Sequence, residues 1–312
     1  MPSISPVTKA YAAIGIGLIA ASFAAVLIRL AQDAGMPSLA IVAERLLLSW
    51  LILSVVVLSR HRDTIRHMRP RNMLLATLAG FWLAAHFSLM AVSLEYGSVL
   101  MAQTIVNTGP LWVALLEVFV LRYRLPKLVW VGLFIAMFGG SLIGFSSAGD
   151  AASGSQPLLG AVLALSSALA GAGYFTIGRK VRAGVPLLPY IWFVYGGGAL
   201  AMLIAVSFTG TSLVGYEPRA YLWILLLALG PQLVSHTSLN YALAYIPATI
   251  TTISGQVISV TAAIAAFVLF AEVPQPLEAV GSFVILAGVV LAILAQNRRR
   301  TPAISAQQQS HS

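Results

Sequence analysis

Residues 35–39 read Gly-Met-Pro-Ser-Leu, and residues 184–188, 149 positions later, read Gly-Val-Pro-Leu-Leu. The same offset aligns further landmarks without a gap: Leu94 and Tyr96 with Leu243 and Tyr245; Gly132, Phe134 and Gly139 with Gly281, Phe283 and Gly288; Asn107 with Gln256. Leu and Ala coincide easily by chance in apolar chains. The Gly, Pro and Tyr matches run through the whole length and predict a duplicated chain.

Each copy of this repeat contains five apolar stretches of about 20 residues, the length that crosses about 30 Å of hydrocarbon. We therefore expect an all-α integral membrane protein with ten transmembrane helices, at 8–31, 37–59, 72–94, 98–121, 126–146, 157–181, 187–210, 219–244, 248–270 and 276–296. Because five is odd, the second copy must cross the membrane in the opposite sense. The pattern predicts a 5+5 inverted-topology repeat, the arrangement that alternating access uses.

The composition agrees with lipid as the main solvent. Of the 312 residues 59% are hydrophobic and only 9% charged, too few charges for a water-facing surface. The net charge of +9 resides in short basic clusters between apolar stretches, which is typical of membrane loops and argues against nucleic-acid binding. Cysteine is absent, which excludes disulfides and thiolate ligands, and the few His and acidic residues form no metal-site spacing. We expect no metal and no cofactor.

The distribution of Lys and Arg predicts the orientation. With the N-terminus inside, fifteen of the 18 Lys and Arg lie on the cytoplasmic side, five of them at 60–71. Both termini are then cytoplasmic, and the short loops fit a bacterial inner membrane. The predicted division is a first repeat at 1–148, a second at 149–297 and a polar cytoplasmic tail at 298–312.

One stretch carries a family resemblance. Residues 107–116 read Asn-Thr-Gly-Pro-Leu-Trp-Val-Ala-Leu-Leu, and together with 121–125, Gly132 and Gly139-Gly140 they resemble the EamA-type repeat of the drug/metabolite transporter superfamily. The second copy has Ala271-Glu272 where that repeat usually carries Gly-Glu. The first copy departs from it with Arg122-Tyr123. The resemblance covers roughly 8–297.

The resemblance implies a basket of ten helices around a central cavity, lined by the first, third, fourth, sixth, eighth and ninth helices. It further implies export of amino acids or related small metabolites. The expected partners are a small-molecule solute and the lipid bilayer, and a monomer is compatible with the sequence.

Polar groups deep in the membrane are costly and therefore indicate function. On helices that the resemblance assigns to the cavity we expect lining by Trp82, His86, Gln103, Asn107, Tyr174, His236, Asn240, Tyr241 and Gln256. On the eighth helix Gln232, His236 and Asn240 recur every four residues and predict one polar stripe. Hydrogen bonding between helices is the alternative explanation for the polar stripes, and interfacial belts or helix packing are the alternative for Tyr174 and Tyr241. His86 also raises the alternative of proton coupling.

Pro110 predicts a break in the fourth helix, as a hinge or as a simple kink. Four charged residues near the outer ends of the first two helices, Arg29, Asp33, Glu44 and Arg45, predict an outer ion-pair latch. A clamp on a solute carboxylate is the alternative for Arg29 and Arg45. Glu117 is expected to form an ion pair at the inner interface with Arg122 or Arg124.

We therefore expect a secondary transporter and not an enzyme. No Walker motif is present, which excludes ATP-driven transport within this chain. The alternative outside transport is an integral-membrane enzyme acting on lipid, but the ionisable groups are too dispersed for a nucleophile–base pair. A channel would more often form a symmetric oligomeric pore. Within transport, a carrier of vitamins, nucleosides or drugs is the alternative.

Overall fold

The computed structural model describes residues 5–96, 102, 105–146, 156–261, 264 and 276–309, and the regular elements in these ranges are helical. They are α1 (Pro6–Ser22), α2 (Ala24–Asp33), α3 (Ser38–Arg60), α4 (Arg62–Arg66), α5 (Pro70–Tyr96), α7 (Gly109–Phe119), α8 (Lys127–Ser146), α9 (Pro157–Arg182), α10 (Leu187–Thr209), α11 (Pro218–Leu227), the π-helix η2 (Ala228–His236), α12 (Thr237–Ala242), α13 (Ala248–Gly255) and α15 (Pro276–Gln309).

Seven helical stretches in the described residues are long and apolar enough to cross a membrane. They are Pro6–Asp33, Ser38–Arg60, Pro70–Ser93, Leu158–Arg182, Leu187–Thr209, Pro218–Ala242 and Ala279–Arg298. Gly109–Phe119 and Lys127–Ile143 are shorter apolar helices. An all-helical integral membrane fold is thus confirmed. The predicted spans 98–121 and 248–270 lie partly outside the described residues.

Prolines place many of the helix starts. Five helices begin with proline, whose fixed φ and missing N–H suit the first turn. At the two repeated turns, Pro37 and Pro186 immediately precede the helices that follow, α3 and α10. Gly35 has φ +83°, a left-handed conformation that glycine adopts without a steric penalty. Both repeated stretches, 35–37 and 184–186, therefore form turns between helices.

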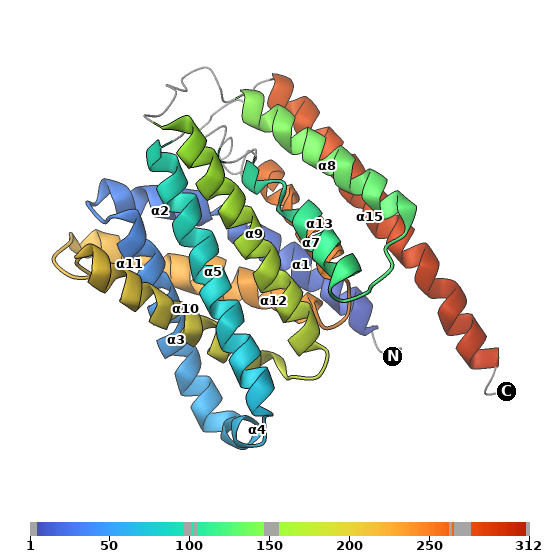
Figure 1. Ribbon diagram of the computed structural model, residues 1–312, viewed down its shortest axis with the longest axis horizontal. Coiled ribbons are helices and arrows are strands. Elements are labelled where there is room, and N and C mark those ends of the chain that lie inside the picture. The colour runs from blue at the N-terminus through green and yellow to red at the C-terminus, as the bar shows by residue number, and fades with distance from the viewer. Residues whose placement is uncertain are drawn as a thin grey trace.

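Helices from the two halves of the chain lie side by side throughout (Figure 1). α8 and α15 form a long pair at one edge, α3 packs on α10, α5 packs on α9 and α10, and α1 packs on η2 and α12. Glycines lie at the closest contacts of the α8–α15 pair. A Cβ added to Gly139 would lie 2.7 Å from the carbonyl oxygen of Gly281, and a Cβ added to Gly288 would lie 2.6 Å from the carbonyl oxygen of Gly132. The helices are antiparallel and touch through backbone, which glycine permits.

Two large apolar clusters hold these helices together. One joins α3, α5, α9 and α10, and the other joins α1, α8, α12, α13 and α15. Large apolar side chains also cover the outside, among them Phe119, Phe208 and Phe283, each at least 75% exposed. Such an apolar exterior suits lipid and would aggregate in water.

The first and the eighth predicted spans are interrupted where the sequence suggested continuous helices. The first breaks at Phe23, between α1 and α2. The eighth changes from α11 to a nine-residue π-helix that contains Pro231, before continuing as α12. Proline lacks an N–H and cannot complete an α-helical ladder, and π segments are frequent at functional sites. At the other end of the chain, α15 runs into the predicted tail as far as Gln309 and passes beyond the end of α8 (Figure 1).

Candidate functional site

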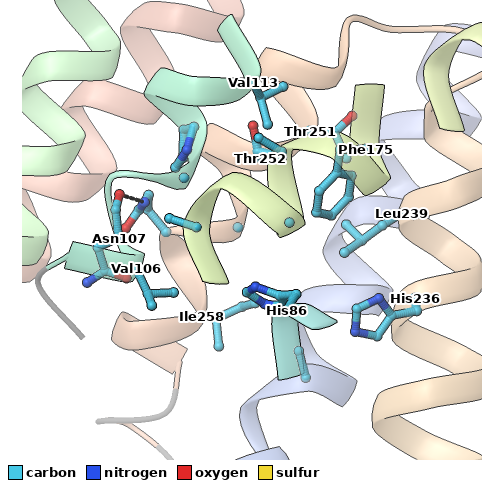
Figure 2. A pocket seen from close by; sticks show the side chains of 18 of the residues that line it. His86, Val106, Asn107, Val113, Phe175, His236, Leu239, Thr251, Thr252 and Ile258 are labelled. Carbon is cyan, nitrogen blue, oxygen red and sulfur yellow. Dashed lines mark hydrogen bonds between the residues drawn. The ribbon is translucent and has the colours of Figure 1, made fainter. Parts of the chain in front are cut away.

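A cavity of about 300 Å³ lies among helices of both halves of the chain. Its polar lining comes from the third, fourth, eighth and ninth predicted helices and is set among small and aromatic side chains (Figure 2). The polar members are His86, Asn107, Ser235, His236, Thr251, Thr252, Gln256 and Ser259. Among the described residues that line it there is no Asp, Glu, Lys or Arg.

Two broken helices meet at this cavity. The α-helical hydrogen-bond pattern is interrupted at Asn107–Thr108, just before α7, and again at Gln256, just after α13, although Thr108 and Gln256 keep right-handed helical φ and ψ. At both places the backbone bonds tighten to i→i+3: Thr108 N donates to the Ile105 carbonyl and Gln256 N to that of Ile253. Asn107 and Gln256 are equivalent positions of the repeat, so both copies break at the same place.

The two breaks are joined by a hydrogen bond. Gln256 Nε2 donates to the Asn107 main-chain oxygen at 2.9 Å (Figure 2). Both side chains lie against Gly140 of α8, where an added Cβ would come within 3.4 Å of each. Gln256 Oε1 is buried and has no hydrogen-bond partner among the described residues. The break in the second copy thus leaves an acceptor available at the cavity.

His86 is fixed between α5 and α9. Its Nδ1 lies 2.9 Å from the Ser167 carbonyl oxygen, and Ser167 Oγ donates to the His86 carbonyl at 2.8 Å. A carbonyl oxygen only accepts, so Nδ1 is the donor in this contact, and in the neutral ring Nε2 is then the acceptor. Gly171 makes room for the ring, since an added Cβ would lie 3.1 Å from Nδ1.

An aromatic wall extends from His86. The Phe87 ring lies 5.3 Å from that of His86 and meets the His236 ring edge-on at 5.5 Å. His236 is the last residue of the π-helix, and its Nδ1 is buried without a partner among the described residues. In Figure 2, His86, His236 and Phe175 border one part of the cavity and Asn107 the part opposite.

Behind this wall lies a buried Arg45. Its Nε and Nη2 both donate to Gln232 Oε1, at 3.0 and 2.7 Å, and its guanidinium carbon lies 4.2 Å from the Phe87 ring centroid. Gln232 is held in turn by Tyr195, whose hydroxyl donates to the Gln232 carbonyl at 2.9 Å. Gln232 and Arg45 are at most 3% exposed.

The predicted lining residues divide into two groups. His86, Asn107, His236 and Gln256 line the cavity. Four others do not: Trp82, Tyr174, Asn240 and Tyr241. Gln103 lies outside the described residues.

Those four side chains have identifiable places in the packing. Trp82 is 44% exposed and stacks against Gly173 on the outside of the bundle. The Tyr174 hydroxyl accepts from Asn240 Nδ2 at 2.5 Å, and Tyr241 pairs with the Tyr245 ring. The predicted stripe on the eighth helix is also divided: Gln232 binds Arg45, and of the three residues only His236 lines the cavity.

The predicted outer latch differs from the structure at Arg45. No carboxylate of a described residue lies within 4 Å of the guanidinium, which binds the Gln232 amide instead. Glu44 is about 100° away around the helix, with Oε1 buried and unpartnered among the described residues. Asp33 is exposed, and the Arg29 side chain lies outside the described part. Neighbours in sequence cannot pair when they leave a helix in different directions.

Glu117 is also placed differently from the prediction. It is 1% exposed, and its carboxylate accepts from Ala248 N and Thr249 N at 2.8 Å and from Thr249 Oγ1 at 2.6 Å. These are the first two residues of α13, whose N–H groups have no partner within the helix. Glu117 therefore joins α7 to the positive end of a helix in the other half of the chain.

Pro110 lies in the first turn of α7, two residues after the break at Asn107–Thr108. Sequence reasoning missed the aromatic residues Phe87 and Phe175, each next to a residue that was selected. A helical period identifies a stripe but not how the helix is rotated about its axis, so a neighbour 100° away can be the lining residue.

Three comparisons place this geometry among known proteins. The profile of the "EamA-like transporter family" matches residues 8–145 and again 158–294. A curated relative, the "Uncharacterized transporter YdfC" of Bacillus subtilis (strain 168), is 26% identical over 197 residues, which span 63% of each chain. A solved structure titled "Crystal structure of protein" has a TM-score of 0.74 at 18% identity, covering 92% of this chain and 98% of that one. The last likeness concerns the fold alone.

Proposed function

The chain belongs to the EamA-like transporter family, and we propose that it is a secondary transporter that exports amino acids or related small metabolites. The observation that carries this proposal is the cavity, whose polar lining comes from both copies of the repeat. Its volume of about 300 Å³ lies at the lower end for small-molecule sites. The solute class and the direction of transport follow the family resemblance.

We further propose alternating access by two inverted five-helix repeats, 1–148 and 149–297, within ten transmembrane helices. A twofold axis that relates each residue to the one 149 positions later would exchange Gly139 with Gly288 and Gly281 with Gly132. The contact between Gly139 and Gly281 then requires an equivalent contact between Gly288 and Gly132. Both contacts occur. The Asn107–Gln256 hydrogen bond joins two equivalent positions, as happens next to such an axis. These contacts support an axis in the membrane plane, with the cavity beside it.

The broken helices support a midplane site for the solute. Inverted-repeat transporters form their sites where interrupted helices expose backbone and polar side chains. Here both interruptions lie at the cavity, and Gln256 Oε1 and His236 Nδ1 have no partner among the described residues. Buried polar atoms usually have partners, so these two are available to a bound solute.

The direct test is counterflow in proteoliposomes loaded with a mixed amino-acid pool and scanned with individual labelled amino acids. We expect saturable uptake of a subset. Asn107→Ala and Gln256→Ala should lower that uptake while leaving membrane expression intact. Gln32→Ala is the matched control, because it removes an amide on the exposed surface of α2. Unchanged uptake in both cavity variants would show that these residues only pack.

We propose that both termini face the cytoplasm of a bacterial inner membrane. The support is the charge distribution, with five Arg at 60–71. Because the chain has no native cysteine, single cysteines report their side without background. His61→Cys should react with a membrane-impermeant maleimide only after permeabilisation, and Ser212→Cys should react in intact cells. The reverse pattern would contradict this orientation.

A further inference from the structure

Arg45 carries a buried charge that the described protein does not neutralise. Its guanidinium is held by one amide oxygen, Gln232 Oε1, and by the face of the Phe87 ring. Seven residues separate it from the start of α3, which places it about 10 Å into the helix. An ionised group at membrane depth is expensive unless a counter-charge meets it.

The cluster also has hydrogen-bond donors to spare. A guanidinium has five N–H groups and Gln232 accepts from two of the three nitrogens. Gln232 Nε2 is itself buried, with no partner among the described residues. Two adjacent side chains thus present unused N–H groups around a positive charge. What is missing is an acceptor that carries negative charge.

This cluster adjoins the cavity. The Phe87 ring has the Arg45 guanidinium over one face and also lines the cavity. His236, four residues from Gln232, lines the same wall and has its own unpartnered Nδ1. The Phe87 ring that carries Arg45 on one face also contacts the rings of His86 and His236. Since the described lining contains no charged side chain, Arg45 dominates the potential at this wall.

We propose that Arg45 and Gln232 form an anion subsite, and that the transported solute carries a carboxylate which docks at the Phe87–His236 wall. The carboxylate neutralises Arg45, and the solute's apolar part lies against Phe87 and Phe175. The solute class is a small organic acid or zwitterion with an apolar or aromatic side group. This inference rests on the proposed transport function and specifies its substrate.

The test uses matched ligands on the purified full chain. Thermal unfolding in detergent is measured with millimolar L-phenylalanine or 3-phenylpropionate, and with their amides, L-phenylalaninamide and 3-phenylpropionamide. Each pair differs only in the carboxylate. We expect at least one acid to raise the unfolding temperature and its amide to have little effect. If no acid stabilises the protein, or the amides match the acids, the anion subsite is wrong.

Two substitutions separate a binding role from a structural one. Arg45→Gln removes the charge and should weaken acid binding at least about 30-fold, the lower end for truncating a buried charge pair. Gln232→Glu supplies an internal carboxylate within reach of Arg45. It should raise the unfolding temperature of the ligand-free protein and abolish the acid-dependent shift. When the ligand-free variant unfolds at or above the wild-type temperature, loss of the acid-dependent shift cannot be attributed to misfolding.

The control is Arg219→Gln, which removes a surface charge that pairs with Glu217. It should keep the full acid-dependent shift. A Gln232→Glu variant that still responds to the acid would overturn the anion subsite. Counterflow of the same acid tests transport separately: binding that depends on Arg45, without counterflow in intact proteoliposomes, would contradict the transporter and leave the subsite standing.

Discussion

Glu117 and Arg45 are both ionisable and almost fully buried, yet their surroundings are opposite. Glu117, at the α7–α13 junction, accepts three hydrogen bonds from α13. Arg45, at the α3–η2 junction, donates to a single neutral oxygen. The Glu117 carboxylate is satisfied by the protein itself, whereas Arg45 lacks a counter-charge among the described residues.

The difference indicates two roles for buried charge in one membrane protein. A satisfied charge that joins the two halves contributes to the fold, and its removal leaves unpaired donors. A charge without a counter-ion beside a cavity contributes little to the fold and is explained by a ligand. Four stability measurements test this contrast, each as a free energy of unfolding in mixed micelles.

The largest effect is expected at Glu117. Glu117→Met leaves two backbone N–H groups and one hydroxyl without their acceptor, and should cost about 4 kcal/mol, given about 1–3 kcal/mol for each abandoned buried group. Glu217→Met, at an exposed acid, is the control and should leave the protein unchanged. A loss at Glu117 no larger than this control would mean that water replaces the carboxylate, and the contrast would disappear.

Gln232→Leu should have the second largest effect. It removes the only hydrogen-bond acceptor that the described residues offer Arg45, and a hydrogen bond to a charged group is worth about 2 kcal/mol. The loss should disappear in an Arg45→Met background, because no charge then needs an acceptor. Equal losses in both backgrounds would show that Gln232 stabilises the protein through another neighbour, for example Tyr195, and not through Arg45.

Thr249→Val tests one bond of the Glu117 set. The valine keeps the shape and removes the hydroxyl that donates at 2.6 Å, so the cost should be about 1 kcal/mol. Thr252→Val is the matched control on the same helix, since its hydroxyl bonds only to carbonyls of its own helix. Similar losses at both positions would indicate an effect of helix propensity.

The sequence predicts the helices well and the buried contacts poorly. Proline and glycine act locally, so turns such as 35–37 and 184–186 are visible in the sequence. Glu117 could not be paired in advance, because its partners lie 131 and 132 positions away and two of its three donors are backbone groups. Arg122 and Arg124 seemed natural partners only because they are near in sequence.

The candidate site shows the same limit. Of the residues selected for polarity and helical spacing, His86 and His236 lie at the cavity, whereas Trp82 is 44% exposed and lies on the outside of the bundle. The break at Gln256 has no proline, so only its equivalence to Asn107 could have suggested it. Gln232 and His236 share one face of the π-helix but meet different neighbours, Arg45 and the cavity, and a residue count does not tell which neighbour each one meets.

Arg45→Met is expected to cost the least stability of the four substitutions and decides the contrast. Replacing a buried charge by an apolar side chain of similar length is often neutral or stabilising, here by about 0–2 kcal/mol, because desolvation of the charge outweighs its attractions. Glu117→Met likewise replaces a buried charge by methionine, and Glu117 and Arg45 are buried to a similar degree. The two variants therefore differ mainly in the contacts that each charge made. A loss at Arg45 as large as at Glu117 would make both charges structural. An Arg45→Met protein that is as stable as the original or more stable, and that no longer responds to a carboxylate, would show that the fold does not need this charge. Binding of an anion is then the explanation for its presence.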